Sequence, residues 1–212
     1  MMPPDPTSLI AKAPVVPVLT IARIEDAVPL ARALAAGGLS VIEVTLRTPV
    51  ALDAVRAIVA EVPECIVGVG TVTEVPDIRQ ALAAGAKYLV SPGTTPELAD
   101  AFARIPVPVL PGCATASEAM ALAARGFPVL KFFPAEAAGG VVFLKSIAAP
   151  LPHLKFCPTG GIDVRNASAY LALPNVVAIG GSWVAPKDAI AAGDFAKITA
   201  LAREAAGLAR AP

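Results

Sequence analysis

Ala33-Leu-Ala-Ala-Gly37 is repeated at Ala81-Leu-Ala-Ala-Gly85 and, with one inserted arginine, at Ala121-Leu-Ala-Ala-Arg-Gly126. Alanine and leucine favour helix, and glycine is the residue that most easily adopts the left-handed backbone that ends one. A short apolar run follows each copy within a few residues. The repeat therefore predicts helices that each lead directly into a buried strand.

Apolar runs and Ala/Leu-rich segments with helical spacing alternate along the whole chain. The predicted strands are Val15–Leu19, Val41–Thr45, Ile66–Gly70, Tyr88–Ser91, Val107–Leu110, Val129–Phe132, Lys155–Pro158 and Val176–Gly180. The predicted helices are Asp26–Ala36, Val50–Glu61, Pro76–Ala84, Pro96–Ala103, Ser117–Ala124, Val141–Ala149, Asn166–Leu173 and Asp194 to about Leu208. Such alternation indicates a parallel α/β sheet, and eight units favour a single closed (β/α)8 TIM barrel over residues 1–212. An open doubly wound sheet is the alternative.

The composition is that of a heavily buried protein. Of the 212 residues, 56% are hydrophobic and 16% are charged, which argues against disorder and suits parallel strands covered on both faces. Lys plus Arg and Asp plus Glu number 17 each, with no basic cluster. This balance argues against nucleic acid and anionic membranes as partners.

Targeting and metal signals are weak. The uncharged stretch from Asn166 to Pro186 is broken by Pro174-Asn175 and Gly180-Gly181, so we interpret it as a helix, a turn and a strand. The N-terminus lacks a basic n-region, and three separated cysteines fit free thiols in a reducing cytoplasm. One histidine and no CxxC motif argue against a zinc site.

Lys131 stands inside an otherwise apolar predicted strand. Because side chains alternate along a strand, Lys131 shares the inward face with Val129 and Phe133. Burial disfavours the ammonium and favours the free amine, which can attack a ketone. The alternative is a structural lysine that an internal carboxylate neutralises.

Glu43 and Arg47 face inward by the same alternation along Val41–Arg47. An internal carboxylate suits a proton shuttle for the amine, although it equally suits a structural ion pair. The Arg47 guanidinium, at the rim, suits a substrate carboxylate, with a rim salt bridge as the alternative.

Two glycine loops follow the seventh and eighth predicted strands, Gly160-Gly161 and Gly180-Gly181-Ser182. In barrels this is the usual position for phosphate, which backbone N–H groups bind. One glycine pair alone would be explained by a turn, but two loops agree.

Together these segments resemble the bacterial 2-keto-3-deoxy-6-phosphogluconate (KDPG) aldolase family, also described as 4-hydroxy-2-oxoglutarate (KHG) aldolases. The matching stretches are Ile42-Glu-Val-Thr-Leu-Arg-Thr48, Gly70-Thr71-Val72, Ser91-Pro-Gly93, Lys131 ahead of Phe132-Phe-Pro-Ala-Glu136, Gly139-Gly140, Phe156-Cys-Pro-Thr-Gly-Gly-Ile162 and Ile179-Gly-Gly-Ser-Trp183.

The resemblance implies a class I aldolase, a lyase that cleaves KDPG to pyruvate and D-glyceraldehyde 3-phosphate in the Entner–Doudoroff pathway. KHG, which gives pyruvate and glyoxylate, is a second expected substrate. It also implies a cytoplasmic homotrimer that needs no metal or other cofactor. A phosphosugar isomerase or epimerase, and a non-catalytic barrel that binds phosphorylated ligands, remain as alternatives.

The resemblance also assigns roles to individual residues. Lys131 forms the Schiff base and Glu43 shuttles protons. The substrate-binding residues that it implies are Arg47 and Thr71 for the carboxylate, Pro92 and Phe133 for the pyruvate pocket, Thr159 for the choice between sugar stereoisomers, and Gly160, Gly161, Gly181 and Ser182 for the phosphate.

Overall fold

Parallel strands and helices alternate along residues 3–209, the part of the chain that this computed structural model describes. The strands are β1 (Val15–Leu19), β2 (Val41–Thr45), β3 (Ile66–Gly70), β4 (Tyr88–Val90), β5 (Val109–Leu110), β6 (Gly112–Cys113), β7 (Val129–Phe132), β8 (Lys155–Pro158) and β9 (Ile179–Gly181). The helices are α1 (Thr7–Ile10), the short 3-10 helix η1 (Ile24–Asp26), α2 (Ala27–Ala36), α3 (Ala51–Glu61), α4 (Val75–Ala83), α5 (Pro96–Phe102), α6 (Ala116–Ala123), α7 (Gly140–Ile147), α8 (Ala167–Leu171), α9 (Lys187–Ala191) and α10 (Phe195–Ala206).

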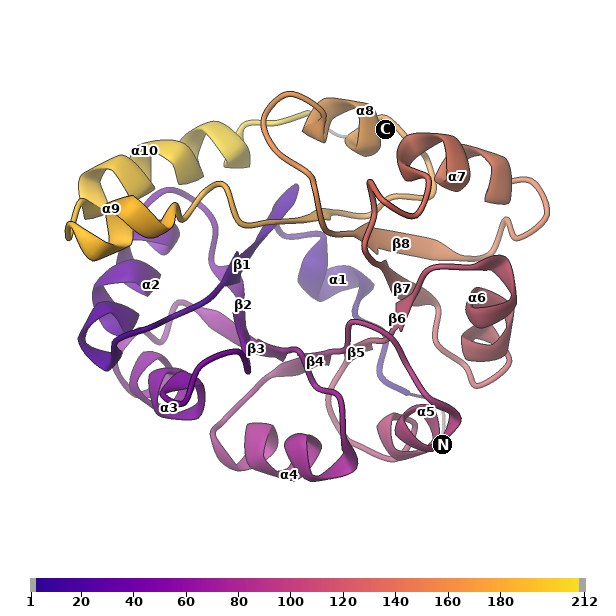
Figure 1. Cartoon of the computed structure of the whole chain (residues 1–212), viewed down its shortest axis with the longest axis horizontal. Helices are drawn as coiled ribbons and strands as arrows, with labels where there is room; N and C mark the ends of the chain where they lie inside the picture. The colour runs from indigo at the N-terminus through magenta and orange to yellow at the C-terminus, as the bar shows by residue number, and fades with distance from the viewer. Residues whose placement is uncertain (1–2, 210–212) are drawn as a thin grey trace.

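The strands curve around a common interior, and the helices lie outside them (Figure 1). They do not form the single closed (β/α)8 barrel that the sequence predicts. Hydrogen bonding divides them into a six-stranded sheet, in the order β5-β4-β3-β2-β1-β9, and a separate three-stranded sheet, β6-β7-β8. The predicted fold class is therefore wrong in this respect. The doubly wound alternative does not fit either, because the last strand, β9, pairs with β1.

The first break between the sheets lies at Pro111. Before this residue the chain pairs with β4, and after it the chain pairs with β7. Proline has no N–H to donate, and the next N–H, that of Gly112, bonds to the Ser91 hydroxyl at 3.0 Å instead of to a backbone carbonyl. The ladder between neighbouring strands therefore ends here.

The second break lies between β8 and β9. Only two isolated pairings join this region, Phe156 with Val176 and Thr159 with Gly180. Pro158, between them, again lacks a donor. The predicted strand Val176–Gly180 consequently shortens and shifts to Ile179–Gly181.

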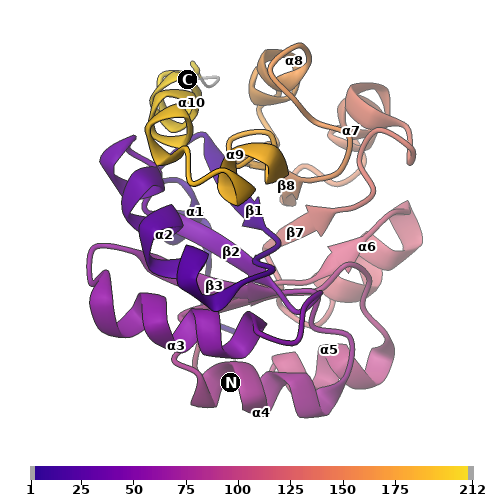
Figure 2. The ribbon, with the colours of Figure 1, turned by 60° about the vertical axis from the view of Figure 1, so that its left-hand side comes forward.

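Most of the other predicted elements are confirmed within one or two residues at their ends. β1, β2, β3, β7 and β8 have the predicted bounds. The sequence reasoning did not predict α1 or α9, which are short, nor β6. In Figure 2, α10 lies beside α2, so the last helix covers the region around the first two strands.

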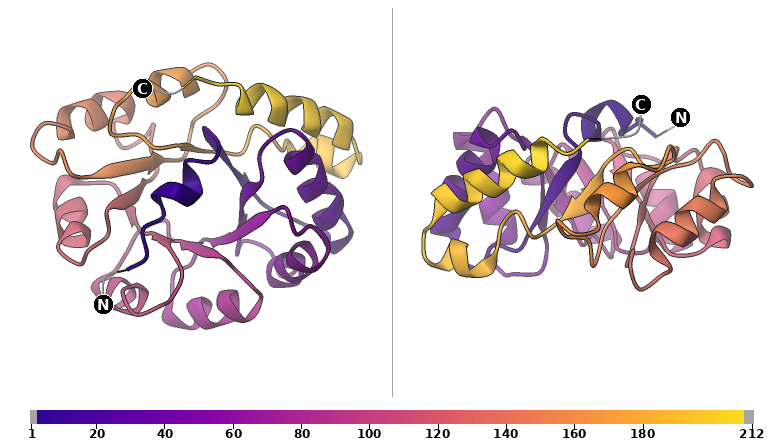
Figure 3. Two further views of the ribbon diagram at one scale, coloured as in Figure 1. Left: turned by 180° about the vertical axis from the view of Figure 1, so that it is seen from behind. Right: turned by 90° about the horizontal axis from the view of Figure 1, so that it is seen from above.

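The helix α1 lies across the back of the ring of strands, as the view from behind in Figure 3 shows. Its residue Ile10 is fully buried against an inner cluster that includes Val41, Tyr88 and Val129. This cluster fills the interior at the end of the strands opposite to the loops that carry the predicted site. The interior is therefore filled by side chains at this end of the strands.

Candidate active site

Lys131 on β7 and Glu43 on β2 meet inside the ring of strands. The Lys131 Nζ donates to Glu43 Oε1 at 3.1 Å, and the two side chains are 3% and 4% exposed. Phe132, the next residue along β7, points to the other face, where it stacks on Phe143 with ring centroids 4.8 Å apart. The strand alternation thus places the amine and the carboxylate in the interior, as predicted.

Two glycines on β3 make room for this interior. A Cβ on Gly70 would lie 1.9 Å from Glu43 Oε1, and a Cβ on Gly68 would lie 2.2 Å from the Tyr88 ring carbon that carries the hydroxyl. Any side chain at either position would displace its neighbour. The absent side chains of β3 therefore create the space that the Glu43 carboxylate and the Tyr88 ring occupy.

Tyr88 and Cys157 are two further titratable groups of the interior that interact with this pair. Burial, with Glu43 nearby, holds the pKa of Tyr88 well above its usual value. Burial also raises the pKa of Cys157 to about 12, although Lys131 acts in the opposite direction. Both groups are therefore protonated at neutral pH, so the Cys157 thiol does not compete with the amine as a nucleophile. All three cysteines are free and buried, which confirms the predicted thiols.

A cavity of about 220 Å³ opens where the strands end. The predicted residues that line it are Arg47, Phe133, Thr159, Gly160, Gly161 and Ser182. Phe133 connects it with the buried pair, because the centre of its ring lies 5.5 Å from Lys131 Nζ. The Lys131 amine thus lies close to a residue that lines the same cavity as the predicted binding residues.

Arg47 and Thr71 also lie together, as the sequence predicts. Arg47 Nε donates to the Thr71 hydroxyl at 3.2 Å. Thr71 has a φ of 62°, a left-handed conformation that β-branched residues rarely adopt and that costs about 1–3 kcal/mol. Strain of this kind is concentrated at functional sites, which supports a role for this turn.

The glycine loop after β8 is held in place by the chain that follows Phe133. Ala135 donates its N–H to Thr159 O at 2.8 Å, and Glu136 donates its N–H to Gly160 O at 3.1 Å. The Glu136 carboxylate in turn accepts a hydrogen bond from the buried Tyr170 hydroxyl. These contacts fix the loop from behind and leave its cavity side open.

Three of the predicted binding residues do not line this cavity: Thr71, which bonds to Arg47, and Gly181 and Pro92. A Cβ on Gly181, in β9, would lie 1.9 Å from the Trp183 ring, so this glycine allows the tryptophan to pack. Pro92 lies against Gly112, where its backbone leaves no room for a side chain. Both positions are close-packed, and their predicted roles in binding remain predictions.

Four residues that line the cavity were not predicted as site residues from the sequence, namely Val18, Thr20, Ile162 and Lys187. Val18 and Thr20 lie at the end of β1, where the strand pattern itself could have pointed to them. The Thr20 hydroxyl lies 3.3 Å from that of Thr45, which in turn donates to Leu19 O at 2.8 Å. Lys187 begins a helix too short to have a sequence signature.

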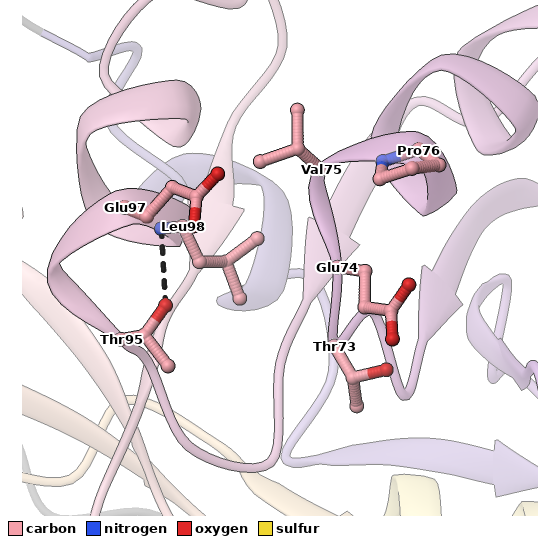
Figure 4. Close-up of a pocket in the computed structure, with 7 residues that line it drawn as sticks. All are labelled: Thr73, Glu74, Val75, Pro76, Thr95, Glu97 and Leu98. Atoms are coloured by element: carbon pink, nitrogen blue, oxygen red, sulfur yellow. Dashed lines mark hydrogen bonds between the residues drawn. The ribbon is translucent and has the colours of Figure 1, made fainter.

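Another cavity, of about 310 Å³, lies between the beginnings of α4 and α5. Figure 4 shows its acidic side chains, Glu74 and Glu97, and the hydrogen bond from Leu98 N–H to the Thr95 hydroxyl. Neither a lysine nor an arginine lines it. Its charge therefore opposes the binding of acidic or phosphorylated molecules, and the cavity beside Lys131 is the better candidate.

Between residues 3 and 209 no group of three or more His, Cys, Asp or Glu side chains is arranged to hold a metal ion. None of the helices within this range is both long enough and apolar enough to cross a bilayer.

Comparison with known proteins identifies relatives over nearly the whole chain. Residues 7–201 match the family described as KDPG and KHG aldolase. The chain is 51% identical to the KHG/KDPG aldolase of Escherichia coli K12 over 198 residues, which is 93% of each protein. It is 47% identical to the 2-dehydro-3-deoxy-phosphogluconate aldolase of Zymomonas mobilis, over 98% of each.

Solved structures agree with these relatives. The KDPG aldolase of Legionella pneumophila, with pyruvate captured at low pH as a covalent carbinolamine intermediate, superposes with a TM-score of 0.94 at 45% identity, covering 96% of this chain and 99% of that one. The Zymomonas mobilis aldolase with 3-phosphoglycerate superposes with a TM-score of 0.91 at 48% identity, over 96% of both chains.

Proposed function

This chain belongs to the KDPG and KHG aldolase family, and on that premise we propose that it cleaves KDPG to pyruvate and D-glyceraldehyde 3-phosphate through a Schiff base on Lys131. The observation that carries the proposal is the buried Lys131–Glu43 pair, with Nζ and Oε1 3.1 Å apart, beside a cavity lined by Arg47. The reaction is that of an aldehyde-lyase in the Entner–Doudoroff pathway.

The first half of the reaction forms the covalent intermediate. Lys131 first passes a proton to Glu43 across their hydrogen bond, and the resulting free amine adds to the C2 ketone to give a carbinolamine, the species captured with pyruvate in the Legionella relative. Glu43, within hydrogen-bond distance of the amine, gives a proton to the departing hydroxyl, which leaves as water. The product is a protonated imine.

The second half breaks the carbon–carbon bond. Glu43, now a carboxylate, removes the proton of the C4 hydroxyl, and the electron pair of the C3–C4 bond moves into the imine. D-glyceraldehyde 3-phosphate leaves and an enamine remains on Lys131. Protonation at C3 and addition of water then release pyruvate and restore the free amine.

Recognition is assigned to the rim. Arg47 and Thr71, already joined by a hydrogen bond, hold the substrate carboxylate, and Phe133 lines the pyruvate pocket. Gly160, Gly161 and Ser182 bind the phosphate through N–H groups and a hydroxyl. The proposal keeps Thr159 as the residue that helps choose between sugar stereoisomers.

KHG is the second proposed substrate, because a relative with 51% identity carries both names. Its cleavage to pyruvate and glyoxylate uses the same amine, acid and Arg47. A cytoplasmic homotrimer without metal or other cofactor remains the proposed working form, and light scattering during size-exclusion chromatography measures the number of subunits.

Reduction with borohydride in the presence of pyruvate tests the mechanism. We expect a covalent pyruvate adduct on Lys131, located by peptide mass mapping, and none in Lys131→Ala. Glu43→Gln is expected to lower kcat by about 10²–10⁴ and to leave slow imine formation. Cleavage of KDPG by Lys131→Ala at the wild-type rate would contradict the proposal and favour a non-covalent barrel enzyme.

A further inference from the structure

Lys187 presents a positive charge to the cavity, and the mechanism above makes no use of it. Ala185 N–H donates to Ser182 O at 3.1 Å, which turns the chain back after β9 and brings Lys187, the first residue of α9, beside the glycine loops. Lys187 then lines the same cavity as Gly161 and Ser182.

The charges around the cavity are of one sign. Arg47 and Lys187 are its charged lining residues, and no carboxylate lines it. In KDPG two groups are anionic, a carboxylate at one end and a phosphate at the other. Arg47 is held by its hydrogen bond to Thr71, the residue that follows β3. It can therefore bind one of these two anionic groups, and the other group is left without a cation.

The Lys187 ammonium is also unused within the protein. It has neither a hydrogen bond nor an ion pair with any residue between 3 and 209, unlike Lys197, which lies 3.5 Å from Asp188, and Lys155, which donates to Pro174 O at 2.8 Å. An exposed cation with no internal partner is able to bind an incoming anion without first breaking a bond.

Lys187 borders two further hollows beside this cavity. One, of about 210 Å³, shares Ser182 with it, and the other, of about 370 Å³, extends to Arg23 and Asp26. Arg23 is occupied there by Asp26, with 2.7 Å between Nη2 and Oδ1. Lys187 is therefore the free cation at the junction of these three spaces among the described residues.

We propose that Lys187 is a specificity-determining residue that binds the phosphate of KDPG and so favours KDPG over KHG, an inference that rests on the proposed function. Arg47 then serves the carboxylate that both substrates share. Lys187 serves the doubly charged phosphate of KDPG, whereas the second carboxylate of KHG carries a single charge and is attached directly to C4, so it extends less far towards Lys187. The N–H groups of Gly160 and Gly161 and the Ser182 hydroxyl position that phosphate, while Lys187 supplies its countercharge.

Steady-state kinetics of Lys187→Met with both substrates test the proposal. We expect the KM for KDPG to rise about tenfold, the usual size of one charge-assisted hydrogen bond at an exposed site, with kcat nearly unchanged. The KM for KHG should change by less than about threefold on the same reasoning. Lys187→Arg should recover most of the preference, and inorganic phosphate should inhibit Lys187→Met less than the wild type.

Lys197→Met is the matched control, because it removes an exposed lysine from the neighbouring helix α10 without changing the cavity lining. An equal rise of KM for both substrates in Lys187→Met, or no rise for KDPG, would overturn the role of Lys187. Failure of the proposed function is distinguishable, since the wild type would then cleave neither substrate and form no pyruvate adduct.

Discussion

The interior and the rim of this site are built in opposite ways. In the interior, Lys131 and Glu43 are buried and bonded to each other, and the strands on which they stand fix their positions. At the rim, Arg47, Ser182 and Lys187 are exposed and leave donors open to the cavity. The groups proposed to perform the chemistry are thus paired within the protein, whereas the groups proposed to recognise substrate keep donors free for a ligand.

This contrast predicts whether a substitution changes turnover, KM or the free energy of unfolding. A change in the interior leaves a buried charge without its partner and affects both turnover and stability. A change at the rim removes the proposed contact with substrate and, within the protein, at most an exposed hydrogen bond, so it should affect KM and leave stability almost unchanged.

The largest effect is expected for Lys131→Met. Turnover should be lost, and the free energy of unfolding should fall by about 3–5 kcal/mol because the Glu43 carboxylate stays buried without a cation. Urea unfolding measures the second effect and pyruvate release the first. Adding Glu43→Gln should recover most of the stability and none of the activity. If Lys131→Met and the double variant Lys131→Met/Glu43→Gln had the same free energy of unfolding, Lys131 and Glu43 would not behave as a coupled buried ion pair.

Arg47→Ala tests the rim. We expect kcat/KM for KDPG and for KHG to fall by about ten- to a hundredfold, the value of a charge-assisted hydrogen bond to a carboxylate. The free energy of unfolding should change by less than about 0.5 kcal/mol. Arg165→Ala is the control, since the exposed Arg165 side chain bonds to Asp163 and to no other residue between 3 and 209. A large loss of stability in Arg47→Ala would contradict the expectation that rim residues contribute little to the free energy of unfolding.

The smallest effect is expected for Tyr88→Phe. Within the described residues the Tyr88 hydroxyl is buried without a hydrogen-bond partner, a state that costs about 1–3 kcal/mol. The variant should therefore unfold at a higher urea concentration. Tyr170→Phe is a matched comparison, because that equally buried tyrosine bonds to Glu136 and should lose stability instead. A loss of stability in Tyr88→Phe would indicate a partner for its hydroxyl, such as an internal water.

Much of the fold follows from local pattern. Val41–Thr45 and Val129–Phe132 have the predicted bounds because a buried parallel strand is an unbroken apolar run between turns, a signal that nearby residues carry. The separation into two sheets is different. It depends on which distant group accepts the Gly112 N–H, and the Ser91 hydroxyl that does so is not a neighbour in sequence. Eight strand-and-helix units in the sequence therefore predicted a closed barrel, although the strands divide into two sheets.

The same division applies to the site. Alternation along a strand was enough to put Lys131 and Glu43 inside, and their meeting follows from that. Strand alternation did not show that Gly68 and Gly70 leave space for the Tyr88 ring and the Glu43 carboxylate, because these contacts are between residues of different strands. Lys187 carried no pattern at all, since an exposed lysine after a proline is ordinary. The roles of the individual site residues, and a single domain over residues 1–212, remain predictions.

The two glycines of β3 set a limit for anyone who wishes to redesign this enzyme. Libraries that widen substrate range usually vary the residues around a pocket, and Gly68 and Gly70 would be natural targets. A methyl group at Gly70 would lie 1.9 Å from the Glu43 carboxylate oxygen. It would therefore displace the Glu43 side chain instead of changing the contacts with substrate. Diversity is better introduced at the exposed loops, where Ser182 and Lys187 stand, and β3 is better left as it is.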